Sequence, residues 1–123
     1  MEIAAGCGVH CEHFASKMNE MNPNLKLKWY PTDPDPPSLQ ALQERISNLG
    51  NIELKKSIQT MPLTLNEEGI MEDETSKIIN QHSESVHPIH FMTCINMIHI
   101  SPWTATLGLF HVASASLAKD GVL

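Results

Sequence analysis

Two glycines near the start of the chain could form a ligand-binding turn. Gly6 and Gly8 follow a short apolar stretch and come just before a helical pattern. Because glycine has no Cβ, a turn of this kind lets a ligand approach the backbone closely. Asp33 follows a second strand pattern, and its carboxylate could accept charge-assisted hydrogen bonds from ribose hydroxyls. The glycine turn and this carboxylate together predict a nucleoside site.

Other readings of the same residues remain open. A dinucleotide site prefers glycine or alanine at the third position of G-x-G-x-x-G, but Cys11 stands there, which disfavours an oxidoreductase. Asp33 could instead cap the following turn, as aspartate often does before proline. Cys7, Cys11 and two nearby histidines are soft metal ligands, but no second ligand pair with zinc spacing follows. We therefore expect no metal site.

The first half of the chain alternates strand and helix patterns. Apolar residues at helical spacing follow the glycine turn and end before residues 22–24, where Pro23 cannot continue a helix. Residues 25–30 alternate apolar and polar side chains, which predicts a strand. A second helix is expected from Ser38, as the N-cap, to Leu49, with Gly50 as its stop.

The second half is less regular. Residues 51–56 and 61–65 are short strand candidates, and residues 66–88 are polar and acidic, which predicts a flexible, solvated loop. The apolar run at 89–100 predicts a strand buried on both faces. A helix is expected over 101–121, with an apolar face formed by Leu107, Phe110, Val112, Ala113 and Leu117, before another strand begins.

Strands that alternate with helices predict an α/β fold, here a Rossmann-like, mostly parallel sheet with flanking helices. Ligands of such sheets bind beyond the carboxyl ends of the strands. The glycine turn, Asp33, Asn66 and Asn96 all fall at predicted strand ends. One domain over residues 1–123 is expected for a chain of this length.

Composition restricts the partners. The formal net charge of −6 disfavours a nucleic-acid partner, which requires a basic surface. No apolar run reaches the roughly 20 residues of a membrane span. Three cysteines and the absence of a basic leader pattern favour a cytoplasmic location. The oligomeric state is not specified by these features.

Three stretches carry a family resemblance: residues 2–15, 29–33 and 94–103, with 108–110 in support. The first, EIAAGCGVHCEHFA, resembles the first motif of class I S-adenosylmethionine-dependent methyltransferases, with Ala4 in place of the first glycine of G-x-G-x-G. Together the stretches are similar to the methyltransferase-like protein 26 family, long classified as a domain of unknown function. The resemblance implies S-adenosyl-L-methionine as the cofactor and an unidentified methyl acceptor.

The resemblance also implies roles for individual residues of the cofactor site. The loop from Ala4 through Gly6 to Gly8 would hold the methionine and ribose portions, and Glu2 would brace that loop. Asp33 would bind the ribose. Asn66, where the family commonly has aspartate, would contact the adenine.

On the acceptor side, Asn96, His99 and Trp103 match the fourth motif of the family and would line the mouth of the site. Asn96 and His99 are the candidate catalytic residues, with His99 as general base if the acceptor must lose a proton. Many methyl transfers need only proximity and alignment. The alternatives are a core or turn role for Asn96 and His99, and ordinary core packing for Trp103.

Similar proteins continue upstream through a helix and a full first strand, and downstream through strands five to seven. We therefore expect an incomplete domain that lacks a full first strand and the strands after the fifth, and that is marginally stable and inactive alone. The predicted function is a methyltransferase. The alternative is a non-catalytic methyltransferase-like module that binds a nucleoside or a protein.

Overall fold

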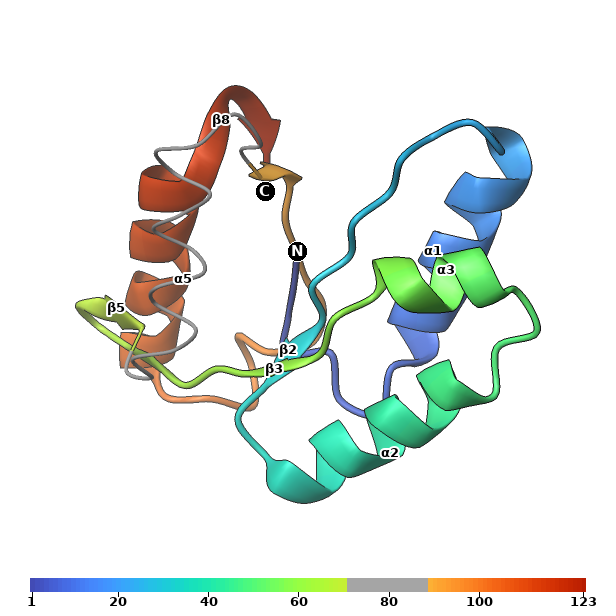
Figure 1. Cartoon of the computed structure of the whole chain (residues 1–123). Coiled ribbons are helices and arrows are strands. Elements are labelled where there is room, and N and C mark those ends of the chain that lie inside the picture. The colour runs from blue at the N-terminus through green and yellow to red at the C-terminus, as the bar shows by residue number, and fades with distance from the viewer. Residues whose placement is uncertain (71–88) are drawn as a thin grey trace.

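The computed structural model describes residues 1–70 and 89–123 as a mixed arrangement of helices and short strands (Figure 1). The helices within these residues are α1 (Val9–Met21), α2 (Pro36–Ser47), α3 (Ile52–Ser57) and α5 (Trp103–Ser116). The strands are β1 (Glu2–Ile3), β2 (Thr32–Asp33), β3 (Met61–Pro62), β4 (Leu65–Asn66), β5 (Gly69–Ile70), β6 (Ile89–Phe91), β7 (Thr93–Cys94) and β8 (Leu117–Val122). An α/β fold was predicted, and the structure confirms it at this level.

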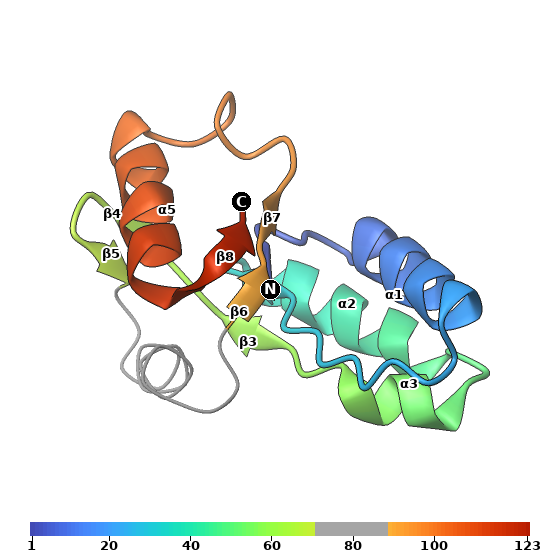
Figure 2. The ribbon, with the colours of Figure 1, turned by 90° about the horizontal axis from the view of Figure 1, so that it is seen from above.

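Most of the strand pairs are parallel. β1 pairs with β7, β2 with β3, and β6 with β8, whereas β4 and β5 form an antiparallel hairpin. A parallel bridge between Glu2 and Pro31 joins β1 to the residues that enter β2. Figure 2 shows β6, β7 and β8 next to the N-terminus, where the Met92 N–H donates to the Val122 carbonyl at 2.8 Å.

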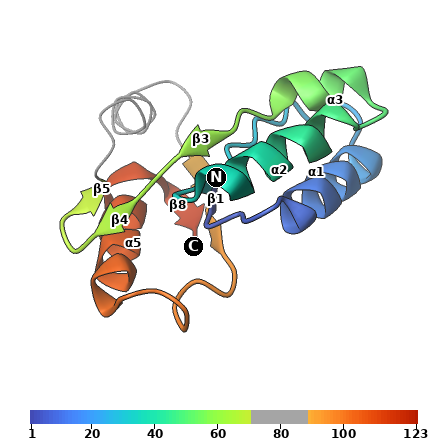
Figure 3. The same cartoon turned by 90° about the horizontal axis from the view of Figure 1, so that it is seen from below.

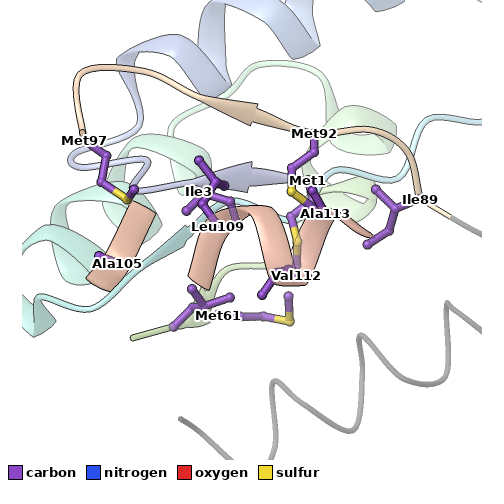
Figure 4. Close-up of a cluster of buried hydrophobic side chains, with 11 residues drawn as sticks. Met1, Ile3, Met61, Ile89, Met92, Met97, Ala105, Leu109, Val112 and Ala113 are labelled. Atoms are coloured by element: carbon purple, nitrogen blue, oxygen red, sulfur yellow. The ribbon is translucent and has the colours of Figure 1, made fainter. Parts of the chain in front are cut away.

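Helices cover both sides of the paired strands. In Figures 1 and 3, α1, α2 and α3 lie on one side of β2 and β3, and α5 lies on the other with the β4–β5 hairpin. Two buried apolar clusters follow this division. The larger one joins β1, β3, β6 and α5 (Figure 4): Met1, Ile3, Met61, Leu63, Ile89, Met92, Met97, Ala105, Leu109, Val112 and Ala113. The smaller one packs the other helices against residue 29: Ala5, Cys11, Ala15, Trp29, Leu42, Ile46, Leu54 and Ile58.

Helix α2 begins earlier than the sequence predicted. Asp35 is its N-cap and accepts a hydrogen bond from the Ser38 N–H at 2.9 Å, so Ser38 lies inside the first turn. Prolines fill the first two helical positions, where the missing N–H has no intrahelical partner to lose. The helix ends at Ser47, before Gly50.

The strand predicted at 51–56 is wrong, because these residues begin helix α3. The Asn51 side chain accepts a hydrogen bond from the Leu54 N–H at 3.0 Å and so caps the helix. Local capping of this kind lets a short polar segment become helical without a strong apolar face. Leu54 alone among the α3 residues is buried.

The strand predicted at 25–30 is also displaced. Trp29 makes a parallel bridge to Ile58, and the named strand begins only at Thr32. Leu25 is exposed and Leu27 is only partly buried against the smaller core, so the alternating pattern before Trp29 lacks a fully buried face. An alternating segment needs a paired neighbour to become a strand, and pairing begins only at Trp29.

The run at 89–100 is a strand only in its first half. After β7 the chain turns at Asn96, whose φ of 62° is left-handed. Ile98 and Ile100 are exposed, so the prediction of burial on both faces was wrong for this part.

The loop expected over residues 66–88 begins with the β4–β5 hairpin. Residues 71–88 lie outside the described residues, so the rest of that expectation stays a prediction.

Helix α5 ends at Ser116, and the residues after it form β8. Leu109, Val112 and Ala113 are buried, whereas Leu107 and Phe110 are exposed. The buried face of α5 is therefore rotated from the predicted one. Because α5 is apolar on most sides, its spacing alone does not determine which side is buried, and the neighbouring elements decide it. Within the described residues, no helix combines the length and apolar character needed to cross a membrane.

The close contact between α5 and the hairpin predicts a cost for any side chain at Gly108. A Cβ there would collide with the backbone carbonyl oxygen of Asn66. We expect Gly108→Ala to lower the free energy of unfolding by about 1–3 kcal/mol, the range for overpacking, although alanine is the better helix former. Urea unfolding followed by circular dichroism measures this. Gly50→Ala, where a Cβ meets nothing within 4 Å, is the control, and equal stability of the two variants would contradict the packing argument.

Candidate functional site

The turn between β1 and α1, residues 4–8, is called the glycine loop below. Its Ala4, Gly6 and Gly8 have positive φ values of 55°, 54° and 80°. Glycine adopts this left-handed region without penalty, whereas alanine is strained there. The loop therefore uses glycine at two of the three positions where the backbone requires it, and Ala4 carries the strain.

Asp33 is bonded directly to the glycine loop. Its Oδ2 accepts a hydrogen bond from the Gly6 N–H at 2.8 Å, and its Oδ1 accepts one from the Asp35 N–H at 3.0 Å. The residue is 7% exposed. The structure thus brings together the two features from which the sequence predicted a site. The turn-capping role considered for Asp33 is also present, since the bond to Asp35 has the geometry of an Asx turn.

The two glycines face different surroundings. At Gly6, a Cβ would meet no heavy atom within 4 Å, whereas at Gly8 it would collide with the Leu42 side chain of α2. The Gly6 side of the loop is therefore open to an approaching molecule, and the Gly8 side is closed by packing. A ligand of this loop would approach at Gly6.

Glu2 lies in β1, the strand that leads into the loop, and only 1% of its surface is exposed. The Trp29 indole Nε1–H donates to its Oε2 at 3.2 Å, and the Thr32 hydroxyl donates to its backbone carbonyl at 2.9 Å. Burial raises the pKa of the Glu2 carboxyl above its ordinary value, opposed by the hydrogen bond from Trp29. These contacts join β1 to the residues around β2, so Glu2 supports the strand rather than bonding to the loop itself.

Arg45 is a site residue that the sequence analysis missed. Its Nε donates to the Cys7 carbonyl at 2.9 Å, and its Nη1 lies 2.6 Å from Glu12 Oε2. The hydrogen bond that Arg45 donates to the Glu12 carboxylate raises the pKa of Arg45, so the side chain remains cationic. The sequence feature that could have indicated Arg45 is its position three residues after Leu42, because this spacing puts both side chains on one face of α2.

Asn66 lies in the β4–β5 hairpin, and its Oδ1 accepts a hydrogen bond from the Glu68 N–H at 3.0 Å. Figures 1 and 3 place this hairpin along α5, on the far side of β2 and β3 from α1 and α2. The residue that directly follows β3 is Leu63, whose N–H donates to the Asp33 carbonyl at 3.3 Å. A backbone hydrogen bond therefore connects Leu63, directly after β3, to Asp33.

Asn96, His99 and Trp103 lie on the segment that leads from β7 into α5, and all three are exposed. Trp103, the first residue of α5, is 66% exposed. Met97 and Ala105 anchor the segment in the larger core. Core packing is therefore wrong for the three predicted acceptor-side residues, which face solvent.

The cysteines and histidines near the loop do not assemble into a ligand set. Among residues 1–70 and 89–123, no three His, Cys, Asp or Glu side chains are grouped so that they could hold a metal ion. Burial raises the pKa of the Cys11 thiol to about 12. A thiol that keeps its proton is a poor metal ligand, because the thiolate is the coordinating form.

The buried Glu2 carboxyl predicts a pH-dependent stability difference. Its pKa is higher in the folded chain than the ordinary value of 4.5, so the folded state binds the proton more tightly and stability falls as pH rises above about 4.5. Glu2→Gln keeps an oxygen to accept from Trp29 but carries no charge. We expect its stability relative to wild type to increase between pH 4 and pH 7, measured by urea unfolding at both pH values.

Glu44→Gln, at an exposed position of α2, is the matched control for the loss of one carboxylate. Its change should stay within about 0.5 kcal/mol and should not vary with pH. A Glu2→Gln difference that is the same at pH 4 and pH 7 would contradict the assignment of a desolvated carboxylate.

The strain at Ala4 predicts an unusual glycine substitution. Ala4→Gly should leave stability unchanged or raise it by up to about 1 kcal/mol, because relief of the left-handed strain opposes the added entropy of the unfolded chain. Ala5→Gly should lower stability by about 1 kcal/mol, since Ala5 is buried and has no positive φ. Thermal unfolding of both variants tests this, and a larger loss for Ala4→Gly would refute it.

A family model described as "Protein of unknown function (DUF938)" matches residues 1–123. No solved structure matches the chain.

Proposed function

Because the chain belongs to this family, whose function is unknown, we propose its function from the site: it is an S-adenosylmethionine-dependent methyltransferase domain of the Rossmann-like class. The observation that carries the proposal is the 2.8 Å hydrogen bond from the Gly6 N–H to Asp33 Oδ2. That bond joins the turn after the first strand to the acidic residue that ends the second. In nucleotide-binding α/β proteins, these two positions contact the same nucleoside.

The order of the strand pairs supports the architecture. β3 pairs with β2, the Glu2–Pro31 bridge connects β2 to β1, and β1 pairs with β7. The first strand thus lies between strands from both halves of the chain. Doubly wound sheets place their first strand in this way, with the ligand at the point where the strand order reverses.

The residues of the glycine loop fit S-adenosyl-L-methionine. Gly6 has free space on the side where a Cβ would project, which leaves room for the cofactor against the backbone. Asp33 uses one acceptor position on each carboxylate oxygen for Gly6 and Asp35. A carboxylate has about four such positions, so two remain for ribose hydroxyls. Ala4, Gly6 and Gly8 would hold the cofactor, with Glu2 supporting β1.

Asn66 receives less support as the adenine contact. Its amide oxygen serves the hairpin, and Leu63 is the neighbour of Asp33 after β3. We propose that apolar contact from this part of the chain accompanies adenine binding, with Asn66 more remote.

When bound, the cofactor supplies a methyl group on a positively charged sulfur. The residues of this chain would orient it through the loop backbone and Asp33, and would present the acceptor from the segment after β7. His99 would take a proton from a nitrogen or oxygen acceptor, and Asn96 and Trp103 would contact the acceptor. The free thiols of Cys7, Cys11 and Cys94 are consistent with a reducing, cytoplasmic setting.

A non-catalytic nucleoside- or protein-binding module is the second candidate. Among the described residues, no hydrogen bond positions the His99 ring or the Asn96 amide, and both side chains are exposed. Catalytic groups are normally held in place by surrounding contacts. The cofactor site would then be used for binding alone.

Calorimetric titration with S-adenosylmethionine tests the proposal. Wild type should bind, and Gly6→Ala should bind at least about tenfold more weakly, a change of about 1.4 kcal/mol, because the new Cβ enters the open space. Alanine is also strained at the positive φ of Gly6, so circular dichroism must first show that Gly6→Ala is folded. Gly50→Ala is the control and should bind as wild type.

Failure of the wild-type chain to bind S-adenosylmethionine, in a sample shown to be folded by circular dichroism, would refute the proposal. Methyl transfer to any of a panel of small-molecule and protein acceptors would exclude the non-catalytic candidate.

A further inference from the structure

We propose that Arg45 is a positioning residue that holds the glycine loop in its binding conformation from the side opposite Asp33. The proposal rests on the proposed function, because the loop is taken to be the cofactor-binding turn. Arg45 acts on the loop through its hydrogen bond to the Cys7 carbonyl.

One guanidinium joins three segments of the chain. Nε of Arg45 donates to the Cys7 carbonyl of the loop at 2.9 Å, and Nη1 is 2.6 Å from Glu12 Oε2 in the first turn of α1. Figure 3 shows α2, which carries Arg45, alongside α1. Because the guanidinium is planar and its donors point in fixed directions, the two bonds set the loop relative to both helices. Arg45 is the only arginine in the sequence.

Two further bonds join the loop to β2. The Ala5 N–H donates to the Thr32 carbonyl at 2.8 Å, and the Gly6 N–H donates to Asp33 at 2.8 Å. These bonds hold loop N–H groups against β2. The Arg45 bond holds a loop carbonyl against α2, so the peptide groups around Cys7 are fixed from two directions.

Packing places the Arg45 side chain against the loop independently of its charge. Leu42, one turn earlier on α2, is fully buried and fills the space beside Gly8. The Arg45 Cδ lies 3.6 Å from the position of a Cβ on Gly8. The aliphatic part of the Arg45 side chain therefore packs against the loop, and this packing places the guanidinium near the Cys7 carbonyl.

The expected role is local rather than global. Arg45 and Glu12 are 36% and 41% exposed, so solvent screens their attraction and the pair adds little to overall stability. A hydrogen bond that orders a mobile turn can still change ligand affinity, because a preorganised site does not lose that freedom on binding.

The test compares three variants with different donor sets. Arg45→Met keeps an unbranched stem but removes both bonds. Arg45→Lys keeps the charge but offers one compact donor, which cannot serve Cys7 and Glu12 in the same geometry. Glu12→Gln removes the ion pair and leaves the bond to the Cys7 carbonyl. Lys56→Met, which breaks an exposed ion pair with Glu53 in α3, is the control for loss of a surface cation.

Two readouts are measured on the full chain. In calorimetry with S-adenosylmethionine, Arg45→Met should bind about tenfold more weakly, the factor expected for loss of one charge-assisted hydrogen bond. Arg45→Lys should also be weakened. Glu12→Gln should be weakened less than Arg45→Met, because its bond to the Cys7 carbonyl remains, and Lys56→Met should bind as wild type. In amide hydrogen exchange without cofactor, the Gly6 and Gly8 N–H groups should exchange faster in Arg45→Met than in Lys56→Met.

The outcomes separate this inference from the proposed function. If wild type binds the cofactor and Arg45→Met binds equally well, the positioning role is wrong. Equal weakening in Glu12→Gln and Arg45→Met would also overturn it, since the ion pair rather than the bond to Cys7 would be responsible. If neither wild type nor any variant binds the cofactor, the proposed function fails. The role of Arg45 in ordering the loop would then be refuted if the Gly6 and Gly8 N–H groups exchanged at the same rate in Arg45→Met and Lys56→Met.

Discussion

The Asp33 carboxylate is the contact on which the site depends. It accepts hydrogen bonds from Gly6 across the chain and from Asp35 within its own turn. Because the residue is almost fully buried, loss of either donor would leave one carboxylate oxygen without its hydrogen-bond partner. The same group therefore determines where the glycine loop lies, how the chain leaves β2, and which acceptor positions remain for a ligand.

The surrounding helices also support this arrangement by packing. On one side, Leu42 of α2 closes the space beside Gly8, and on the other, Gly108 allows α5 to approach the backbone of the β4–β5 hairpin. Both contacts need a missing Cβ at the point of closest approach. The two apolar clusters then bury the faces of these helices against the short strands, whose own ladders contain few hydrogen bonds.

The acceptor side is organised differently from the cofactor side. Residues of the glycine loop and Asp33 are connected by bonds to β2 and α2, whereas Asn96, His99 and Trp103 face solvent. A site with one ordered and one exposed half suits a constant cofactor and an acceptor that contributes its own contacts on arrival.

The sequence by itself determined the features that depend on local chemistry. Helix α1 after the glycine turn, the alternation of strands and helices, and the pairing of an open glycine with Asp33 all follow from spacing and residue type. Tertiary structure decided what depends on neighbours. Residues 51–56 became helical through the Asn51 cap, α5 buried Leu109 instead of Phe110, and Arg45 reached Cys7 from another helix. The reason is that spacing reports which side chains share a face, whereas the partner that covers that face comes from a distant part of the chain.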